Sequence, residues 1–305
     1  MRISNATLQQ SMMLELQRAQ NSFTDAQGRV ASGKIGNDLK AFGSKAELAS
    51  AGHLARARAE QRIELAKQME TRFEIQALSL QRAEEGANGL KQELLDALGA
   101  NSGIGIGSAL NTAFAQAKSA FNMEMNGNYI FGGTRTDTLP INIETLDDLG
   151  SAPNVAYIFS NNDTKPTADF GEGSSEIGQT ASEVGTQLFL VIKNIKDYID
   201  LNGSFGSPLS TAQQDFLKSQ LPLVDQAAAT IVQAEGINGA QAKYVETLRL
   251  QQDDLRLALT KFVTNVEDAD IVEASVQVQQ SQLAYEAAAQ TLSKLNSLSL
   301  LDFLR

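Results

Sequence analysis

The sequence predicts a mainly α protein. We expect an elongated antiparallel helical rod or coiled coil made by both ends of the chain, with a small β-containing module inserted into it. Three observations predict this fold class. All five prolines lie between residues 140 and 222, which leaves the first 139 and the last 83 residues free to form long unbroken helices. Apolar residues recur at heptad spacing in both end segments. Between them, residues 136–180 are rich in turn-forming residues.

The clearest repeat lies in the C-terminal segment, residues 270–305. One row recurs every seven residues: Ile271, Val278, Tyr285 and Leu292. A companion row follows three residues later: Ala274, Ser281, Ala288 and Leu295. A heptad repeat makes a narrow apolar seam that has to meet another helix. The repeat continues into an apolar end, formed by Leu298, Leu300, Leu301, Phe303 and Leu304. Because termini are usually polar, this end is typical of a segment buried against a partner, such as another copy of the chain.

A matching seam predicts a helix over residues 6–32. Its apolar residues step by four and three positions: Met12, Leu16, Ala19, Phe23, Ala26 and Val30. Gly33 and Gly36 end it, and residues 32–39 read as a loop. The two ends of the chain therefore carry complementary seams, and the simplest arrangement pairs them.

Further helices fill most of the chain between these ends. Apolar spacing predicts a very long helix over 45–98, roughly 80 Å at about 1.5 Å per residue, and shorter helices over 108–125, 184–201, 211–235 and 240–266. Pro222 should kink or divide one of them, and a turn is expected at residues 236–239.

The insert is predicted to be acidic and to face solvent. Residues 136–180 hold eight acids and one lysine, which is −7 of the chain's net −11, and β-prone pieces occur at 139–143 and 155–159. We expect three domains: a terminal helical assembly domain (1–40 with 266–305), a helical rod domain (41–135 with 181–265) and the acidic outer insert (136–180).

Composition excludes several classes of function. The net charge argues against nucleic-acid binding, which needs a basic surface. The absence of cysteine excludes disulfides and thiolate chemistry. We expect no membrane insertion, because no stretch reaches 18 consecutive apolar residues, and no secretory signal, because the first residues lack a basic start and an apolar core.

Candidates for chemistry are weak. His53, the one histidine, lies within the long predicted helix and reads as a surface or packing residue. Gly103, Gly105 and Gly107 precede a helix without the lysine of a phosphate loop, so a turn is the better interpretation. Glu267, Asp268 and Asp270 lack the spacing of a calcium loop, and Asp268 or Asp270 should cap the last helix. Two short glycosylation sequons begin at Asn162 and Asn202. The sequence therefore predicts neither an enzyme nor a cofactor.

Four stretches resemble the flagellin superfamily, and most of all its hook–filament junction proteins, the FlgL-type hook-associated proteins. They are VASGKIGNDL (30–39), NYIFGGTRTDTLPI (128–141), GTQLFLVIKNI (185–195) and LSLLDFL (298–304). The second is the most specific. The resemblance covers nearly the whole chain apart from residues 142–180. One departure is LKAFGSKA (39–46), which stands where an Asp-Asp-Pro stretch is common in the family.

The resemblance implies a structural subunit of the bacterial flagellum that joins the hook-associated zone to the flagellin filament. Its expected place is extracellular, after type III flagellar export without a cleaved signal peptide. Its expected partners are copies of itself in a ring or helical layer, a neighbouring hook-associated protein, flagellin, and an export chaperone with the export apparatus. The terminal helices would then fold on assembly. The expected assembly interface comprises Met12, Leu16, Phe23, Val30, Ile271, Val278, Tyr285, Leu292, Leu295, Leu298, Leu301, Phe303 and Leu304.

Three alternatives remain at this point. The chain could be a flagellin that forms the filament itself, whose Leu-Arg ending it shares. The seams could simply be the core of an intramolecular bundle, in a soluble helical binding protein or an enzyme. A chemoreceptor-like signalling rod is a third reading, for which the expected membrane span is missing from the sequence.

Overall fold

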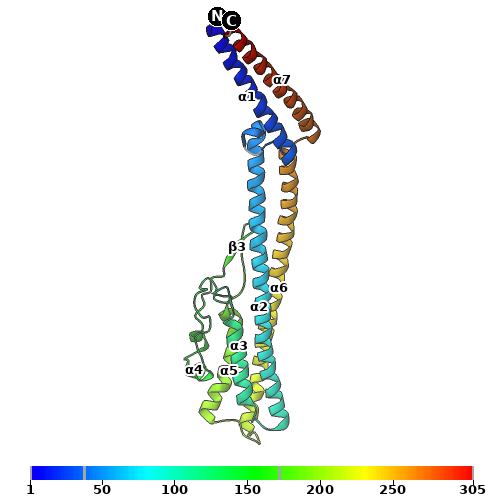
Figure 1. Ribbon diagram of the computed structural model, residues 1–305. Coiled ribbons are helices and arrows are strands. Elements are labelled where there is room, and N and C mark those ends of the chain that lie inside the picture. Colours follow the sequence, from blue (N-terminus) through cyan, green and yellow to red (C-terminus); the bar gives the residue numbers. More distant parts are fainter. Residues whose placement is uncertain (1, 37–38, 171–172, 304–305) are drawn as a thin grey trace. The chain divides into compact units, whose positions relative to one another are not determined.

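A computed structural model of the protein describes residues 2–36, 39–170 and 173–303 (Figure 1). The helices are α1 (Arg2–Ser32), α2 (Ala46–Ala100), α3 (Ile106–Phe121), α4 (Leu146–Ser151), α5 (Ala181–Asn202), α6 (Thr211–Glu267) and α7 (Ile271–Phe303), with 3-10 turns at Leu39–Lys45 and Val155–Ile158. The strands β1 (Glu124–Met125) and β2 (Asn128–Tyr129) form one antiparallel pair, and β3 (Thr167–Asp169) and β4 (Ser174–Glu176) form another. The prediction of a mainly α fold with a small β-containing insert is confirmed.

Packing divides the chain into two compact units. Unit 1 comprises Met1–Glu60 and Asp253–Arg305, and unit 2 comprises Gln61–Gln252. The long helices α2 and α6 each contribute residues to both units. The division into three domains by function stays a prediction.

In unit 1, α1 and α7 lie side by side and antiparallel, so the two chain ends are at the same end of this helix pair (Figure 1). We call α1 and α7 the terminal pair. The rings of Phe23 and Tyr285 stack across it, with centroids 6.5 Å apart. Ala26, Ala274 and Ser281 are buried along the same seam. The predicted pairing of the two chain ends is confirmed.

The connections at the base of the terminal pair are hydrogen-bonded to each other. The Ala269 N–H donates to the Gly33 carbonyl at 2.9 Å, and the Ile35 N–H donates to the Glu267 carbonyl at 2.8 Å. Gly33 has φ +70°, a left-handed conformation that glycine adopts without strain. Asp270 caps α7, because its carboxylate accepts the Val272 N–H at 2.8 Å.

Unit 2 has a large apolar core. The apolar face of α3 packs against α5, and both contribute to one buried cluster with residues of α2 and α6. Phe121 lies at its centre, 5.4 Å from the ring of Phe131 and 6.1 Å from that of Phe189. A Cβ on Gly185 would lie only 3.0 Å from the Phe121 ring, so a glycine lets α5 approach α3 closely.

The insert contributes to this core on its inner side. Leu146, Leu149, Val155 and Ile158 are buried in the main cluster, whereas its described acids are exposed, as predicted. The positions of its strands were predicted wrongly. A single bridge joins Ile141 and Phe159 in the described part of the insert. Residues 155–158 form a 3-10 turn, because Val155 and Ile158, three positions apart, are both buried on one side of it. The 108–125 helix ends early, at Phe121, since the chain turns there into the β1–β2 hairpin.

The helix was predicted to be kinked or divided at Pro222, and it is not divided there; the predicted turn at 236–239 is wrong. Thr211–Glu267 is one continuous helix with Pro222 inside it. Leu217, Val224 and Ile231 are buried on both sides of the proline. Tertiary packing on both sides therefore outweighs the local cost of proline and glycine.

Candidate assembly site

The predicted interface residues of the terminal pair mostly face each other. Met12, Leu16 and Phe23 of α1 are half-buried, and so are Val278, Tyr285 and Leu292 of α7. The fully buried positions on this seam hold small side chains, Ala26, Ala274 and Ser281. These residues are largely occupied by the contact between α1 and α7 within one chain.

Other predicted residues lie elsewhere. Val30 and Ile271, at the base of the pair, are exposed. The side chains of Leu295, Leu298, Leu301 and Phe303, and the whole of Leu304, lie outside the described residues. Their assignment to an assembly interface stays a prediction.

A second apolar row on α7 was missed. Val272, Val276 and Leu283 are 74%, 48% and 67% exposed. At about 100° per residue, these three positions lie within about 40° of one another, on the side of α7 opposite the seam. We call them the outer row. Their spacing of four and seven residues is present in the sequence, beside the longer heptad repeat of the seam.

The buried carboxylate of Glu267, at the end of α6, contacts both α2 and the connection that follows α1. One oxygen of Glu267 contacts Nε2 of His53, and the other lies 3.0 Å from Nζ of Lys34. The hydrogen bond from His53, reinforced by Lys34, lowers the pKa of Glu267. His53 is therefore a packing residue with a specific partner. The sequence could not predict this contact, because 214 positions separate the two residues.

The remaining chemical candidates are structural. Among the described residues, no group of three or more histidine, cysteine, aspartate or glutamate side chains could hold a metal ion. A Cβ on Gly103 would lie 2.3 Å from that of Phe205, so the glycine serves a close approach of two loops. The Asn162 side chain is bonded to Thr134, donating to its hydroxyl at 2.6 Å. In the part of the chain that is described, no helix is long and apolar enough to cross a membrane.

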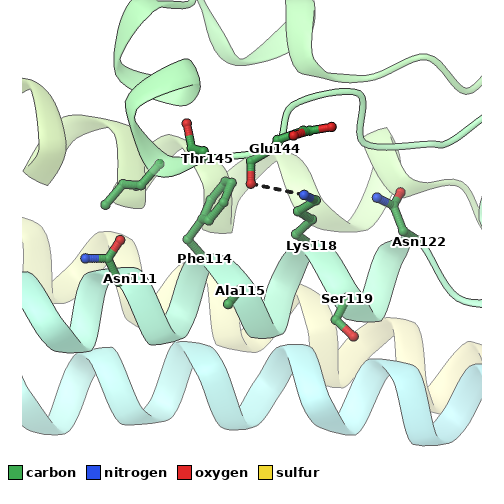
Figure 2. Close-up of a pocket in the computed structure, with 9 residues that line it drawn as sticks. Asn111, Phe114, Ala115, Lys118, Ser119, Asn122, Glu144 and Thr145 are labelled. Carbon is green, nitrogen blue, oxygen red and sulfur yellow. Dashed lines mark hydrogen bonds between the residues drawn. The ribbon is translucent and has the colours of Figure 1, made fainter.

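A groove of about 570 Å³ lies beside α3 in unit 2 (Figure 2). Its polar groups are used within the protein. Lys118 donates to the Glu144 carbonyl at 3.0 Å, and the amide of Asn122 exchanges two hydrogen bonds with the backbone of Ile141. These bonds attach the insert to α3. The groove is lined by Asn111, Phe114, Ala115, Lys118, Ser119, Asn122, Glu144, Thr145 and Leu146.

Solved structures with a similar fold include two flagellar proteins. One is assigned as a flagellar hook-associated protein of Vibrio parahaemolyticus, with 16% identity and a TM-score of 0.59; the match covers 73% of this chain and 97% of that one. The other is FlgL of Bacillus cereus, with 17% identity, a TM-score of 0.54, and 71% and 98% coverage. No family model and no curated protein matches the sequence. The chain therefore has the fold of flagellar hook-associated proteins of the FlgL type, in agreement with the resemblance of its sequence motifs.

Proposed function

We propose that this protein is a non-enzymatic structural subunit of the bacterial flagellum, an adaptor that joins the hook-associated zone to the flagellin filament. The observation that carries the proposal is the terminal pair, whose α7 presents an exposed apolar outer row within a fold shared with FlgL. The alternative, a flagellin that forms the filament body, uses the same helices and differs in its products of assembly.

The terminal pair is weak by itself, which supports a role in assembly. Its seam buries alanine and serine where a strong coiled coil places leucine or isoleucine. Two isolated helices joined in this way gain little stability, because most helical stability in proteins comes from packing of an apolar face. Neighbouring subunits would supply the missing contacts.

Burial of the outer row would drive that step. Complete burial of one valine or leucine side chain contributes about 1.5–3 kcal/mol. Val272, Val276 and Leu283 together therefore offer several kcal/mol for each subunit, against the entropy cost of association. We propose that the predicted seam residues order the terminal pair and that the outer row, with the apolar end 298–304, contacts neighbouring subunits.

The remaining parts of the proposal follow from this role. The subunit would act outside the cell, in the flagellum, after export by the flagellar apparatus with a chaperone. It would contact its own copies in a ring or helical layer, a hook-associated protein on one side and flagellin on the other. The exposed acids of the insert would face the medium.

Assembly products separate the adaptor from the alternative. Purified protein added to hook fragments should form short caps or rings visible by electron microscopy. Long filaments made of this protein alone would contradict the adaptor role and favour a flagellin.

Imaging of cells that lack the protein tests the same role in vivo. The expected phenotype is hooks without filaments, with flagellin released into the medium. Complementation with the wild-type gene is the control. Normal filaments on the mutant cells would contradict the proposal.

A further inference from the structure

Unit 2 contains a polar layer between two apolar clusters. The larger cluster includes Leu80, Phe131 and Ala234. The smaller cluster joins the β3–β4 hairpin to α2 and α6, and comprises Ala66, Phe73, Ala168, Phe170, Ile177, Val245 and Leu248. Four buried polar side chains lie where the two clusters meet: Arg72 and Gln76 on α2, Gln179 before α5, and Asn238 on α6. We call these four the polar layer.

Hydrogen bonds place three of the four side chains in one locality, and Gln76 follows Arg72 by one turn of α2. The Asn238 amide donates to the Phe73 carbonyl at 2.9 Å, which holds it against α2 next to Arg72. The Gln179 amide donates at 2.8 Å to the Ala234 carbonyl, one turn of α6 before Asn238. The Arg72 guanidinium donates to the Ile130 carbonyl at 2.8 Å.

Five atoms of the polar layer have no hydrogen-bond partner among the described residues. Two are donors, Nε of Arg72 and Nε2 of Gln76; three are acceptors, Oε1 of Gln76, Oε1 of Gln179 and Oδ1 of Asn238. Gln76 is fully buried and uses neither end of its amide. An unpaired buried amide or guanidinium group is costly, about 1–3 kcal/mol for each group, and native proteins rarely leave several together.

Gly178 leaves room beside two of these side chains. It has φ +77°, and a Cβ built on it would lie 3.7 Å from both Nη2 of Arg72 and Oε1 of Gln76. Both side-chain ends therefore face the same side of this glycine. Its own N–H donates to the Gln241 side chain at 3.1 Å, which holds the loop in place.

The unpaired atoms of the polar layer include both donors and acceptors, which favours a ligand that can both accept and donate hydrogen bonds. Arg72 is 9% exposed, and burial lowers its pKa; no carboxylate among the described residues lies within ion-pair distance of it. An anion could offset its charge, but three of the five unpaired atoms are oxygens that can only accept a hydrogen bond. Water both donates and accepts, and interior waters typically make about three hydrogen bonds to otherwise unpaired groups.

We propose that the polar layer is an internal binding site for ordered water, which bridges Arg72 and Gln76 on α2 to Gln179 and Asn238 beside Gly178. This hydrated layer separates the two apolar clusters. The smaller cluster, with the β3–β4 hairpin, then opens as a unit of its own, without unfolding of the larger core.

A high-resolution crystal structure of the full chain tests the site directly. The expected density is water within about 2.7–3.2 Å of at least three of the five atoms. Direct bonds among the four side chains, with no water between them, would overturn the proposal. Anomalous signal at this position in crystals grown with bromide would also overturn it, in favour of an anion site.

Hydrogen exchange of the variant Gln76→Met gives an independent test in solution. Methionine fills similar space without polar atoms. If Gln76 binds the water, the variant removes two of the groups that hold it, and exchange of the β3 and β4 amides accelerates by about three- to tenfold. Direct bonds of Gln76 would give the same acceleration but no water in the crystal structure of the unaltered protein, so the two measurements together separate the cases. Unchanged or slower exchange contradicts the proposal.

The matched control is Gln68→Met, the same substitution on an exposed position of α2. It should leave exchange of the hairpin unchanged. The α3 amides report on the larger core, and we expect no change in them in either variant. The crystal structure of the unaltered protein decides the question by itself if Gln76→Met fails to fold.

Discussion

Units 1 and 2 are built from similar long helices but differ in what they bury. The largest fully buried side chains of the described chain, among them Phe73, Phe121, Phe131 and Phe189, all belong to unit 2. In unit 1 the terminal pair buries Ala26, Ala274 and Ser281 and exposes Val272 and Leu283. Unit 2 therefore holds the larger apolar core of the described chain, whereas the terminal pair buries small side chains and leaves apolar ones exposed.

Removal of residues 298–305 should have the largest effect on assembly. We expect incorporation into flagella to be abolished, because the apolar end of α7 loses its contacts with neighbours. Unit 2 should keep its structure, measured by circular dichroism and by the unfolding transition of the purified chain. Normal incorporation of the truncated protein would contradict the proposal that residues 298–305 contact neighbouring subunits.

Leu283→Lys tests the outer row within the described residues. A charge placed in a buried intersubunit contact costs several kcal/mol, so incorporation should fall by more than about tenfold. Stability of the monomer should change by less than about 0.5 kcal/mol, since Leu283 is exposed there. Quantification in sheared flagella provides the measurement. Gln282→Lys, an exposed neighbour outside the row, is the control, and equal incorporation of both variants would refute the outer row as an interface.

Because the two units differ in how much they bury, the same Phe→Ala change should reduce the free energy of unfolding by different amounts in each. Phe121→Ala should lower the free energy of unfolding by about 3–5 kcal/mol, because it leaves a cavity in a packed core. Phe23→Ala removes a half-buried ring stacked on Tyr285, and should cost about 0.5–1.5 kcal/mol. Denaturant unfolding of the purified variants measures both. Similar losses would show that the terminal pair is as well packed as unit 2.

The smallest expected effect concerns Glu267. Its pKa is lowered in the folded chain, so its contribution is present above the ordinary value of 4.5 and is lost as the pH falls through the lowered value. Glu267→Gln should therefore be less stable than the wild type at pH 7, with a difference that shrinks below pH 4.5. The difference should stay below about 1 kcal/mol, because His53 and Lys34 are half exposed. A difference that grows in acid would contradict this assignment. Thermal unfolding at several pH values measures it.

Periodic features of the fold could be predicted from the sequence. The heptads of Phe23 and Tyr285 predicted that the two chain ends pair, and the motif at 128–141 pointed to the fold found in FlgL. Features set by distant contacts could not be predicted. Pro222 remains inside a helix because buried residues flank it, and the contact between Glu267 and His53 joins two helices that are far apart in the sequence.

The assembly surface itself stays a prediction. The sequence predicted that α1 and α7 pair, but it could not tell which apolar face of α7 the helix α1 would cover. The seam with Tyr285 is used within the chain, and Val272 and Leu283 remain exposed. Both faces carry apolar residues at helical spacing, so only the packed structure separates them.

The hydrogen-bonded connections at the base of the terminal pair have a mechanical consequence. The bonds from Ala269 to Gly33 and from Ile35 to Glu267 tie the two polypeptide segments that leave the pair. A pulling force applied to α1 or α7 alone is thereby divided between both segments before it reaches either long helix. Such a tie resists the withdrawal of one helix while its partner stays in place.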